Sequence, residues 1–467
     1  MIDTHCHLEM EDFGADLDAV IRRAKESGVE AIVTIGSDIG GCEGAVSLSA
    51  KHDFVYAAVG IHPHDAKDFS DDVYSRLRTW ISDGRGLRPH RDADDCISAP
   101  KVVALGEIGL DYHYDHSPRE KQREVFEKQL LLAKDIDLPV IVHSREAEAD
   151  TLEILRQSGV RKGVMHCFSG DVEMAEKTLE LGFHISIAGP VTFKNTAVLK
   201  KVARHVPDER LLVETDAPYL APEPFRGKRN EPSYVIETAR FIAGLRGISL
   251  DDIDRITSLN AKRLFGIGEA DEARIAYKIR DSLYLNITNR CTNKCTFCIR
   301  YQSDFVKGHN LRLGSEPTEK ELKQAIGDPS KYKEIVFCGY GEPTLRFDVV
   351  KSVAAWVKKH GGKVRINTNG HANVINGRNV LPELKGLVDA ISVSLDAQDE
   401  ETYKKICRPS FEGAFAAVLD FLRKAKHFIP DVKATIVEME GVDVGKCEQL
   451  CEGLGVGLRV RKLDIVG

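Results

Sequence analysis

The sequence predicts an α/β protein made of two barrels, a complete (β/α)8 TIM barrel followed by a partial (β/α)6 barrel. Over residues 1–266, eight runs of apolar and β-branched residues alternate with amphipathic stretches, the order from which parallel barrels are built. From Ser282 onward a second alternation contains six such runs. Between them lies a charged stretch, 267–280 (IGEADEARIAYKIR). We interpret this stretch as a linker between a first domain, 1–266, and a second domain, 281–467.

The first domain supplies the eight strands that a closed barrel needs. The predicted strands are Ile2–Thr4, Glu30–Ile35, Val55–Val59, Val102–Gly106, Pro139–Val142, Gly163–His166, His184–Ile187 and Arg210–Val213. Amphipathic patterns between them predict helices at Arg119–Ile136, Glu146–Ser158 and Asp171–Leu181. The segment Gly84–Pro100 is polar, contains Pro and Gly and breaks the alternation, so we interpret it as a surface insertion.

The second domain repeats the pattern with fewer strands. The predicted strands are Ser282–Thr288, Glu334–Cys338, Lys363–Asn367, Ala390–Ser394, Val432–Val437 and Gly457–Asp464. Six parallel strands with helices between them predict an open, partial barrel.

Composition and charge restrict the partners and the compartment. The net charge of -7 gives no global positive field, so any contact with nucleic acid must be a local patch. No charged N-terminal segment precedes an apolar run, and no run of about 18 apolar residues occurs, so we expect neither a signal peptide nor a membrane span. The eleven cysteines are scattered apart from one triplet, which argues against a disulfide framework and favours the reducing cytoplasm.

The first candidate site is a set of metal-ligating side chains at the ends of predicted strands. In a (β/α)8 barrel, reactive residues gather at the carboxyl ends of the strands. His5 and His7 follow the first strand and point to the same side of an extended segment, so they can hold one ion together. The remaining candidates at strand ends are Glu107, His143, His166 and Asp216. Four imidazoles and two carboxylates suffice for two divalent ions, and Glu107 is the best placed to bridge them.

The residues around these positions resemble the TatD family of metal-dependent hydrolases. The motifs are DTHCH, GIHPHD, ALGEIGLDYHY, VIVHSRE, MHCFSGD, GPVTFKN and VETDAPYLAPEPFRGKRNEP. The resemblance implies a TIM-barrel hydrolase of phosphodiester bonds, usually an exonuclease on DNA or RNA, although some members are linked to deacylation of aminoacyl-tRNA. It places one ion on His5, His7, Glu107 and Asp216, and a second on Glu107, His143 and His166, the ions being Mg, Mn or Zn. The insertion departs from the family pattern.

Catalytic and substrate-binding roles follow from the same chemistry. Two ions lower the pKa of a shared water and hold the oxygens of the scissile group, while Asp216, with Glu107 as the second catalytic residue, is positioned to accept the proton of that water. A phosphodiester also needs polar and cationic partners. The substrate-binding candidates are His62, His64, Lys194, Arg226 and Arg229.

The second candidate site is the triplet Cys291-x3-Cys295-x2-Cys298, directly after a predicted strand. Structural zinc usually takes four ligands in two Cys-x2-Cys pairs, and this spacing does not provide them. Three thiolates leave one iron of a [4Fe-4S] cluster open to a small molecule. Four other cysteines, Cys338, Cys407, Cys447 and Cys451, leave open whether they are core residues or ligands of an auxiliary cluster.

The triplet and the turn Tyr340-Gly341-Glu342-Pro343 resemble the radical S-adenosylmethionine superfamily, whose turn usually begins with Gly rather than Tyr340. The resemblance implies that the cluster binds S-adenosylmethionine and cleaves it to a 5′-deoxyadenosyl radical. It also implies a reductant such as flavodoxin or ferredoxin. The implied cofactor-binding residues are Phe297, Gly341, Glu342 and Ser394.

The combination resembles TatD-associated radical proteins, in which the two modules are encoded together or fused. It predicts a bifunctional enzyme in which a two-metal hydrolase of the DNase type is joined to a radical enzyme with an unknown substrate. One alternative is a nucleic-acid processing enzyme whose radical half modifies bases. Another alternative is a binding protein in which one module is degenerate. The ligand sets of both modules are complete, which argues against this alternative.

Overall fold

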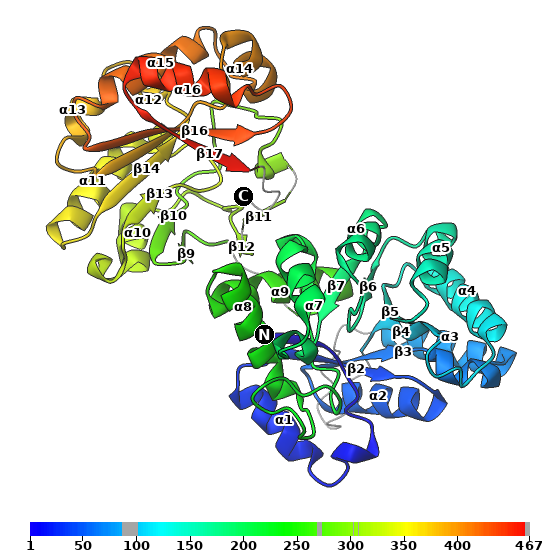
Figure 1. Cartoon of the computed structure of the whole chain (residues 1–467). Coiled ribbons are helices and arrows are strands. Elements are labelled where there is room, and N and C mark those ends of the chain that lie inside the picture. Colours follow the sequence, from blue (N-terminus) through cyan, green and yellow to red (C-terminus); the bar gives the residue numbers. More distant parts are fainter. Residues whose placement is uncertain (86–100, 269–272, 302, 307, 463–467) are drawn as a thin grey trace. The chain divides into compact units, whose positions relative to one another are not determined.

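The computed structural model describes residues 1–85, 101–268, 273–301, 303–306 and 308–462. The chain divides into two compact units, Met1–Glu269 and Ala270–Gly467 (Figure 1). Each unit has its own hydrophobic core. No helix in these described ranges combines the length and apolar character needed to cross a membrane. Most of the predicted insertion, 86–100, lies outside the described residues, whereas Gly84 and Arg85 end a helix.

The first unit is a parallel eight-stranded barrel whose strands follow one another in chain order. The strands are β1 (Ile2–Cys6), β2 (Ala31–Gly36), β3 (Val55–Val59), β4 (Val102–Asp111), β5 (Val140–Arg145), β6 (Gly163–Met165), β7 (His184–Ile187) and β8 (Leu211–Val213). The barrel closes where the amide of Asp216 donates to the carbonyl of His5 at 2.9 Å and the amide of His7 donates to that of Ala217 at 2.7 Å. This closure confirms the predicted (β/α)8 barrel.

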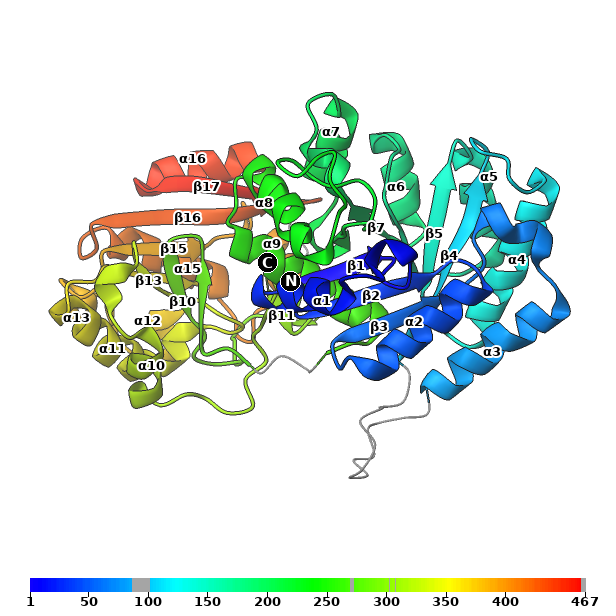
Figure 2. The same cartoon turned by 90° about the horizontal axis from the view of Figure 1, so that it is seen from below.

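Helices surround the strands of this unit, as the view in Figure 2 shows. They are α1 (Leu17–Glu26), α2 (Ile39–Lys51), α3 (Asp71–Arg85), α4 (Arg119–Asp135), α5 (Glu148–Ser158), α6 (Val172–Glu180), α7 (Ala197–His205), α8 (Val235–Arg246) and α9 (Leu250–Phe265). Side-chain caps define several starts, since Asp38 and Asp171 accept amide hydrogen bonds and Ser249 forms a capping box with Asp252.

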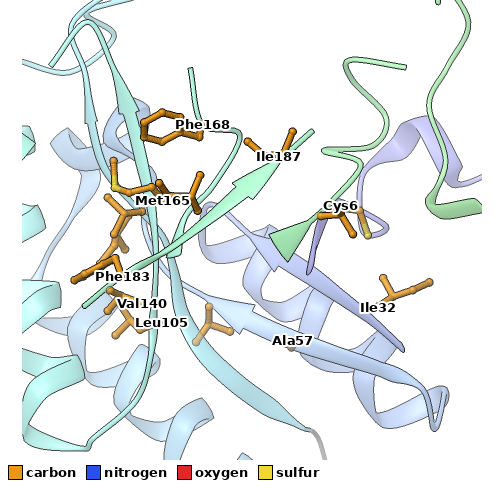
Figure 3. Close-up of a cluster of buried hydrophobic side chains, with 14 of the residues drawn as sticks. Cys6, Ile32, Ala57, Leu105, Val140, Met165, Phe168, Phe183 and Ile187 are labelled. Atoms are coloured by element: carbon orange, nitrogen blue, oxygen red, sulfur yellow. The ribbon is translucent and has the colours of Figure 1, made fainter. Parts of the chain in front are cut away.

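The core of the barrel has two layers that follow the alternation of the strands. In one layer the helices pack against buried residues such as Ile32, Leu105 and Met165, which Figure 3 labels among the side chains of this cluster. Residues of opposite parity form a second, inner cluster, to which α9 contributes Phe265 and the segment after it contributes Ile267. The inner layer closes the barrel below the polar residues at its carboxyl end.

Two irregular strands aim polar side chains into the barrel. β4 has one extra residue relative to β5 between Leu105 and Ile108, and β1 has a similar irregularity against β2 between Asp3 and Cys6, the segment that contains His5. Bulges of this kind redirect side chains next to active sites. Within the β4 bulge, a Cβ on Gly106 would lie 2.6 Å from the Cβ of Ile141, so only glycine fits beside Glu107.

The second unit has a seven-stranded sheet in the order β17-β16-β15-β14-β13-β10-β9. Its strands are β9 (Ala276–Ile279), β10 (Ser282–Leu285), β13 (Ile335–Phe337), β14 (Val364–Thr368), β15 (Ala390–Ser394), β16 (Asp431–Glu438) and β17 (Gly457–Lys462). Six strands of this sheet run parallel, namely β10, β13, β14, β15, β16 and β17, which confirms the six-stranded partial barrel. Strand β9 pairs antiparallel with β10. A separate hairpin joins β11 (Phe305–Val306) and β12 (His309–Asn310).

The helices of the second unit lie between successive strands. They are α10 (Glu319–Ile326), α11 (Phe347–Lys359), α12 (Ala372–Ile375), α13 (Leu381–Leu384), α14 (Glu400–Cys407), α15 (Ala414–Ala425) and α16 (Val444–Leu454).

The linker predicted at 267–280 is shorter than expected, because residues at both of its ends belong to the folded units. Ile267 is buried in the first unit, while 276–279 form β9 because the buried Tyr277 pairs with Tyr284 of β10.

Candidate functional site

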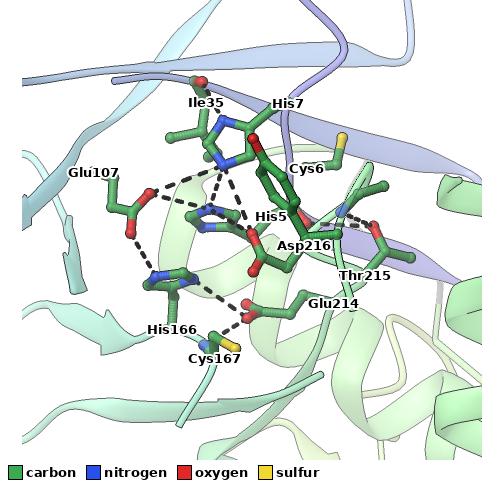
Figure 4. A network of polar contacts seen from close by, with 12 residues as sticks. His5, Cys6, His7, Ile35, Glu107, His166, Cys167, Glu214, Thr215 and Asp216 are labelled. Atoms are coloured by element: carbon green, nitrogen blue, oxygen red, sulfur yellow. Dashed lines mark hydrogen bonds and ion pairs between the residues drawn. The ribbon is translucent and has the colours of Figure 1, made fainter. Parts of the chain in front are cut away.

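The six predicted metal ligands converge at the carboxyl end of the barrel (Figure 4 shows five of them). On one side, the Nε2 atoms of His5 and His7 lie 3.3 Å apart. Each is 3.7 Å from Oδ1 of Asp216, and His5 Nε2 is 3.5 Å from Oε2 of Glu107. These atoms form the first ligand set.

The other oxygen of Glu107 faces a second ligand set. Glu107 Oε1 lies 2.7 Å from Nδ1 of His143 and 2.6 Å from Nε2 of His166. Those two imidazole nitrogens are 3.4 Å apart. The two oxygens of one buried carboxylate therefore serve two separate histidine pairs, which is the arrangement that a carboxylate bridging two divalent ions requires.

The electrostatics of the centre suit cationic metals. Burial alone would raise the pKa of Glu107, but the neighbouring His166 and His62 bring it well below its usual value. Burial lowers the pKa of His62 to about 4, so this imidazole is neutral at physiological pH. The carboxylates beside His7, His143 and His166 outweigh burial and raise the pKa of each imidazole. Metal binds to neutral imidazoles and ionised carboxylates, so divalent ions would replace the protons that this negative environment attracts. The donor set therefore fits two divalent ions.

Three further carboxylates lie beside the histidines of the site and were not predicted from the sequence. Asp111 Oδ2 accepts hydrogen bonds from Nε2 of His143 at 3.2 Å and from Nε2 of His64 at 3.0 Å. Nδ1 of His7 lies 3.0 Å from the carbonyl of Ile35 and 3.3 Å from the carboxylate of Glu9, whereas Glu214 lies 3.4 Å from Nδ1 of His166 without a hydrogen bond to it. Such partners fix the tautomer and the ring orientation of metal-ligating histidines. Motif spacing alone gives no signal for them, because their role depends on which ring nitrogen they face.

The ligand centre lies at the base of a cavity of about 880 Å³. His62 and His64 line it, as predicted, but Nε2 of His62 is 3.6 Å from Oε1 of Glu107. His62 also forms a ligand-like group with Glu107 and His143, so its position suits metal binding as well as substrate contact.

Three predicted phosphate-binding cations do not line this cavity. Lys194 and Arg226 are absent from its walls, and the guanidinium of Arg226 lies 4.3 Å from the centroid of the Phe193 ring. Arg229 donates to the carboxylate of Asp16 at 2.8 and 2.9 Å, and its role in substrate binding stays a prediction, as do those of Lys194 and Arg226. The one Arg or Lys that lines the cavity, among the described residues, is Arg145.

The predicted cluster loop of the second unit follows β10 and is tied to the end of α14. The amide of Thr296 donates to Ile406 O at 2.9 Å, and that of Lys294 donates to Cys407 O at 3.0 Å. Cys291, Cys295 and Cys298 are free thiols on this loop. Three unpaired thiols on one anchored loop fit sulfur ligation of an iron–sulfur cluster.

The remaining cysteines of the second unit divide into two groups. Cys407 lies beside the loop, where a hydrogen bond with Cys295, together with burial, raises its pKa. Cys447 and Cys451 are fully buried on α16 among hydrophobic side chains, which is the environment of core residues. Cys338 follows β13 and is half-buried.

The predicted cofactor-binding turn is tightly built into the protein. Glu342 is 3% exposed and accepts hydrogen bonds from the amide of Asn369 at 2.7 Å and from the hydroxyls of Thr344 and Thr368 at 2.6 and 2.8 Å. A Cβ on Gly341 would approach the carbonyl of Arg290 to 2.2 Å, so close backbone packing requires this glycine. These contacts show a structural role for the turn in addition to the predicted role in cofactor binding.

The other two predicted cofactor contacts are both half-buried. Phe297 is half-buried and packs against the core of the second unit. Ser394 is half-buried at the last position of β15. Their roles in cofactor binding stay predictions.

Comparisons with known proteins agree with this geometry. A family described as TatD related DNase matches residues 2–266, and the Radical SAM superfamily matches residues 285–452. The uncharacterized metal-dependent hydrolase YabD of Bacillus subtilis is 45% identical over 269 residues, covering 57% of this chain and 99% of that protein. The 3′-5′ ssDNA/RNA exonuclease TatD of Erwinia tasmaniensis is 33% identical over 275 residues, covering 57% of this chain and 100% of that protein.

A solved structure supports the fold of the first unit. The crystal structure of YJJV, a TatD homolog from Escherichia coli, matches with a TM-score of 0.52 and 32% identity, covering 57% of this chain and 98% of that one. The chain therefore belongs to the TatD-related DNase family of metal-dependent hydrolases and carries a radical SAM domain after it.

Proposed function

We propose that this chain is a bifunctional enzyme in which a two-metal phosphodiesterase and a radical S-adenosylmethionine enzyme share one polypeptide. The observation that carries the hydrolase assignment is the carboxylate of Glu107, whose two oxygens face two histidine pairs. The exonuclease activity named for the Erwinia relative supports nucleic acid as the substrate class.

In the hydrolase unit, two divalent ions supply an activated water and neutralise charge on the scissile phosphate. One ion would be held by His5, His7, Glu107 and Asp216, and the other by Glu107, His143 and His166. Burial raises the pKa of Asp216, but the imidazoles of His7 and His5 outweigh this and lower it. Asp216 is therefore ionised, and its carboxylate can accept a proton at the centre of the site.

In the radical unit, a [4Fe-4S] cluster with S-adenosylmethionine supplies a 5′-deoxyadenosyl radical. Cys291, Cys295 and Cys298 would bind the iron, and the buried contacts between their loop and the end of α14 hold the thiols in place. An external reductant such as flavodoxin or ferredoxin has to supply the electron. Free thiols at all ten described cysteines support function in the reducing cytoplasm.

The hydrolase assignment is tested with the full chain on single-stranded DNA, with Mg2+, Mn2+ or Zn2+ added. Asp216→Asn should lower kcat roughly a hundredfold or more, as expected for loss of a proton acceptor. Glu180→Gln, an exposed substitution at the end of α6, is the matched control and should leave kcat unchanged. Full activity in Asp216→Asn, or in the presence of EDTA, would refute the assignment.

The radical assignment is tested by anaerobic reconstitution with iron and sulfide, followed by reductive cleavage of S-adenosylmethionine under dithionite. Cys298→Ala should lose both the cluster absorbance and the cleavage. Cys447→Ala changes a buried cysteine on α16 and should retain both. Cleavage that persists in Cys298→Ala would show that the triplet is not the cluster site.

A further inference from the structure

The mouth of the hydrolase cavity gathers exposed hydrophobic side chains. Five large hydrophobic residues are exposed in the described part of the first unit. Four of them line this cavity, namely Tyr114, Val198, Tyr219 and Leu220, and only Leu131 lies elsewhere. Exposed apolar surface concentrated at one cavity indicates a ligand with an apolar or aromatic part. Metal ligation and phosphate binding give no reason for such a surface.

The cation at this mouth is held in a defined position. Arg145 follows His143 by two residues on β5, so both side chains leave the strand on the same side. Its guanidinium lies 4.7 Å from the centroid of the Tyr114 ring, and that ring stacks on His116 at 5.6 Å with an interplanar angle of 6°. Arg145 forms no ion pair with a carboxylate of the described residues, so its charge is available within the cavity.

An aromatic ring comes from the loop after β8. The amide of Tyr219 donates to the carbonyl of Asp216 at 2.9 Å, and its ring centroid lies 6.4 Å from that of His7 at a steep angle. The side chain is nevertheless 52% exposed, and its hydroxyl contacts only the sulfur of Met10 at 3.6 Å among the described polar groups. The ring is thus fixed beside the first ligand set with surface free for a ligand.

We propose that Arg145 and Tyr219 form a nucleotide subsite beside the metal centre. The guanidinium binds a non-bridging phosphate oxygen, and the phenol ring stacks on the base of the same or the adjacent nucleotide. Arg suits phosphate because its planar, fork-shaped donors match the oxygens, and aromatic rings stack on any base that is unpaired. This assignment rests on the proposed phosphodiesterase function and deepens it, because it requires a strand whose terminal base is unstacked.

The test compares two single-stranded oligonucleotides that differ only in the terminal nucleotide, one with its base and one with an abasic tetrahydrofuran residue. Tyr219→Leu should lower kcat/KM about tenfold on the normal strand and leave the abasic strand nearly unchanged. Tyr219→Phe keeps the ring and should retain wild-type discrimination. Leu131→Ala, an exposed hydrophobic substitution outside the cavity, is the matched control.

The role of Arg145 is tested separately from that of Tyr219, by removing the positive charge of its side chain. Arg145→Gln should weaken cleavage of both strands, and the slope of log K against log salt for a labelled phosphorothioate strand should fall by about one. Lys51→Gln removes an exposed cation at the end of α2 that does not line the cavity and should leave this slope unchanged. An unchanged salt slope in Arg145→Gln would overturn the phosphate contact.

The outcomes distinguish this subsite from the function on which it rests. Equal losses on the two strands in Tyr219→Leu, or no loss, would overturn the base contact while cleavage by the unaltered chain still supports the phosphodiesterase. If the unaltered chain cleaves neither strand with any of the three metals, the proposed function fails and the subsite fails with it.

Discussion

Replacing Asp111 by Asn tests whether the buried carboxylate controls one half of the metal centre. Asp111 is 1% exposed, and its Oδ1 accepts the amides of His113 and Tyr114 at 3.0 Å each. Asparagine can retain these two bonds through its own oxygen. Its amide nitrogen, however, would replace Oδ2, which accepts the Nε2 protons of His143 and His64.

The magnitude follows from the tautomer of His143. With Asp111 present, Nε2 of His143 donates and Nδ1, which lies 2.7 Å from Glu107, is free to bind metal. An Asn amide donates instead, which favours a proton on Nδ1 and blocks ligation. Loss of such a partner typically weakens metal binding or activity 10- to 100-fold, or about 1.4 to 2.8 kcal/mol.

The assay is calorimetric titration of the apo chain with Mn2+ or Zn2+, which resolves two binding steps when the affinities differ. We expect Asp111→Asn to weaken one step and leave the other near its original value. Glu9→Gln, next to His7 in the first ligand set, is the matched comparison and should weaken the opposite step. Equal weakening of both steps by Asp111→Asn, or no change, would refute the reasoning.

Three further outcomes are expected. Gly341→Ala should lower the Tm of the second unit and spare hydrolase activity, because its Cβ would approach Arg290 O to 2.2 Å; calorimetry and a nuclease assay check this. Residues 1–268 alone should fold and cleave single-stranded DNA, since all six ligands and a separate core lie there, and an inactive but folded fragment would contradict this. Cys295→Ala should lose iron as Cys298→Ala does, whereas Cys451→Ala should keep it, as measured by iron content per chain.

The periodicity of the sequence predicted the barrels because it reports burial. In each strand of the first unit, alternate residues face either the helices or the barrel interior, and both environments are apolar. Apolar runs such as 55–59 could therefore be predicted as strands. β9 was missed because its four residues lie within a charged stretch, and only pairing with β10 makes it a strand. The extension of β4 to Asp111 was missed because the bulge at Gly106 interrupts the alternation.

The metal ligands were predictable because a barrel collects the ends of its strands at one rim. Their environment was not, because it depends on ring orientation and on contacts between segments far apart in sequence. Asp111 bonds to His143 and His64 from a neighbouring strand end, and no local pattern marks that role. The pairing of Arg229 with Asp16 depends on the fold in the same way, because the two residues lie far apart in the sequence.

The measurement that tests the two-metal account most directly is the metal content of the full chain and of Glu107→Gln, determined by mass spectrometry after anaerobic reconstitution. The unaltered chain should hold about two divalent ions in the hydrolase unit and about four irons in the radical unit. Because one carboxylate faces both ligand sets, Glu107→Gln should lose both divalent ions together and keep its iron. Retention of both divalent ions, or loss of only one, would contradict the bridging role of Glu107.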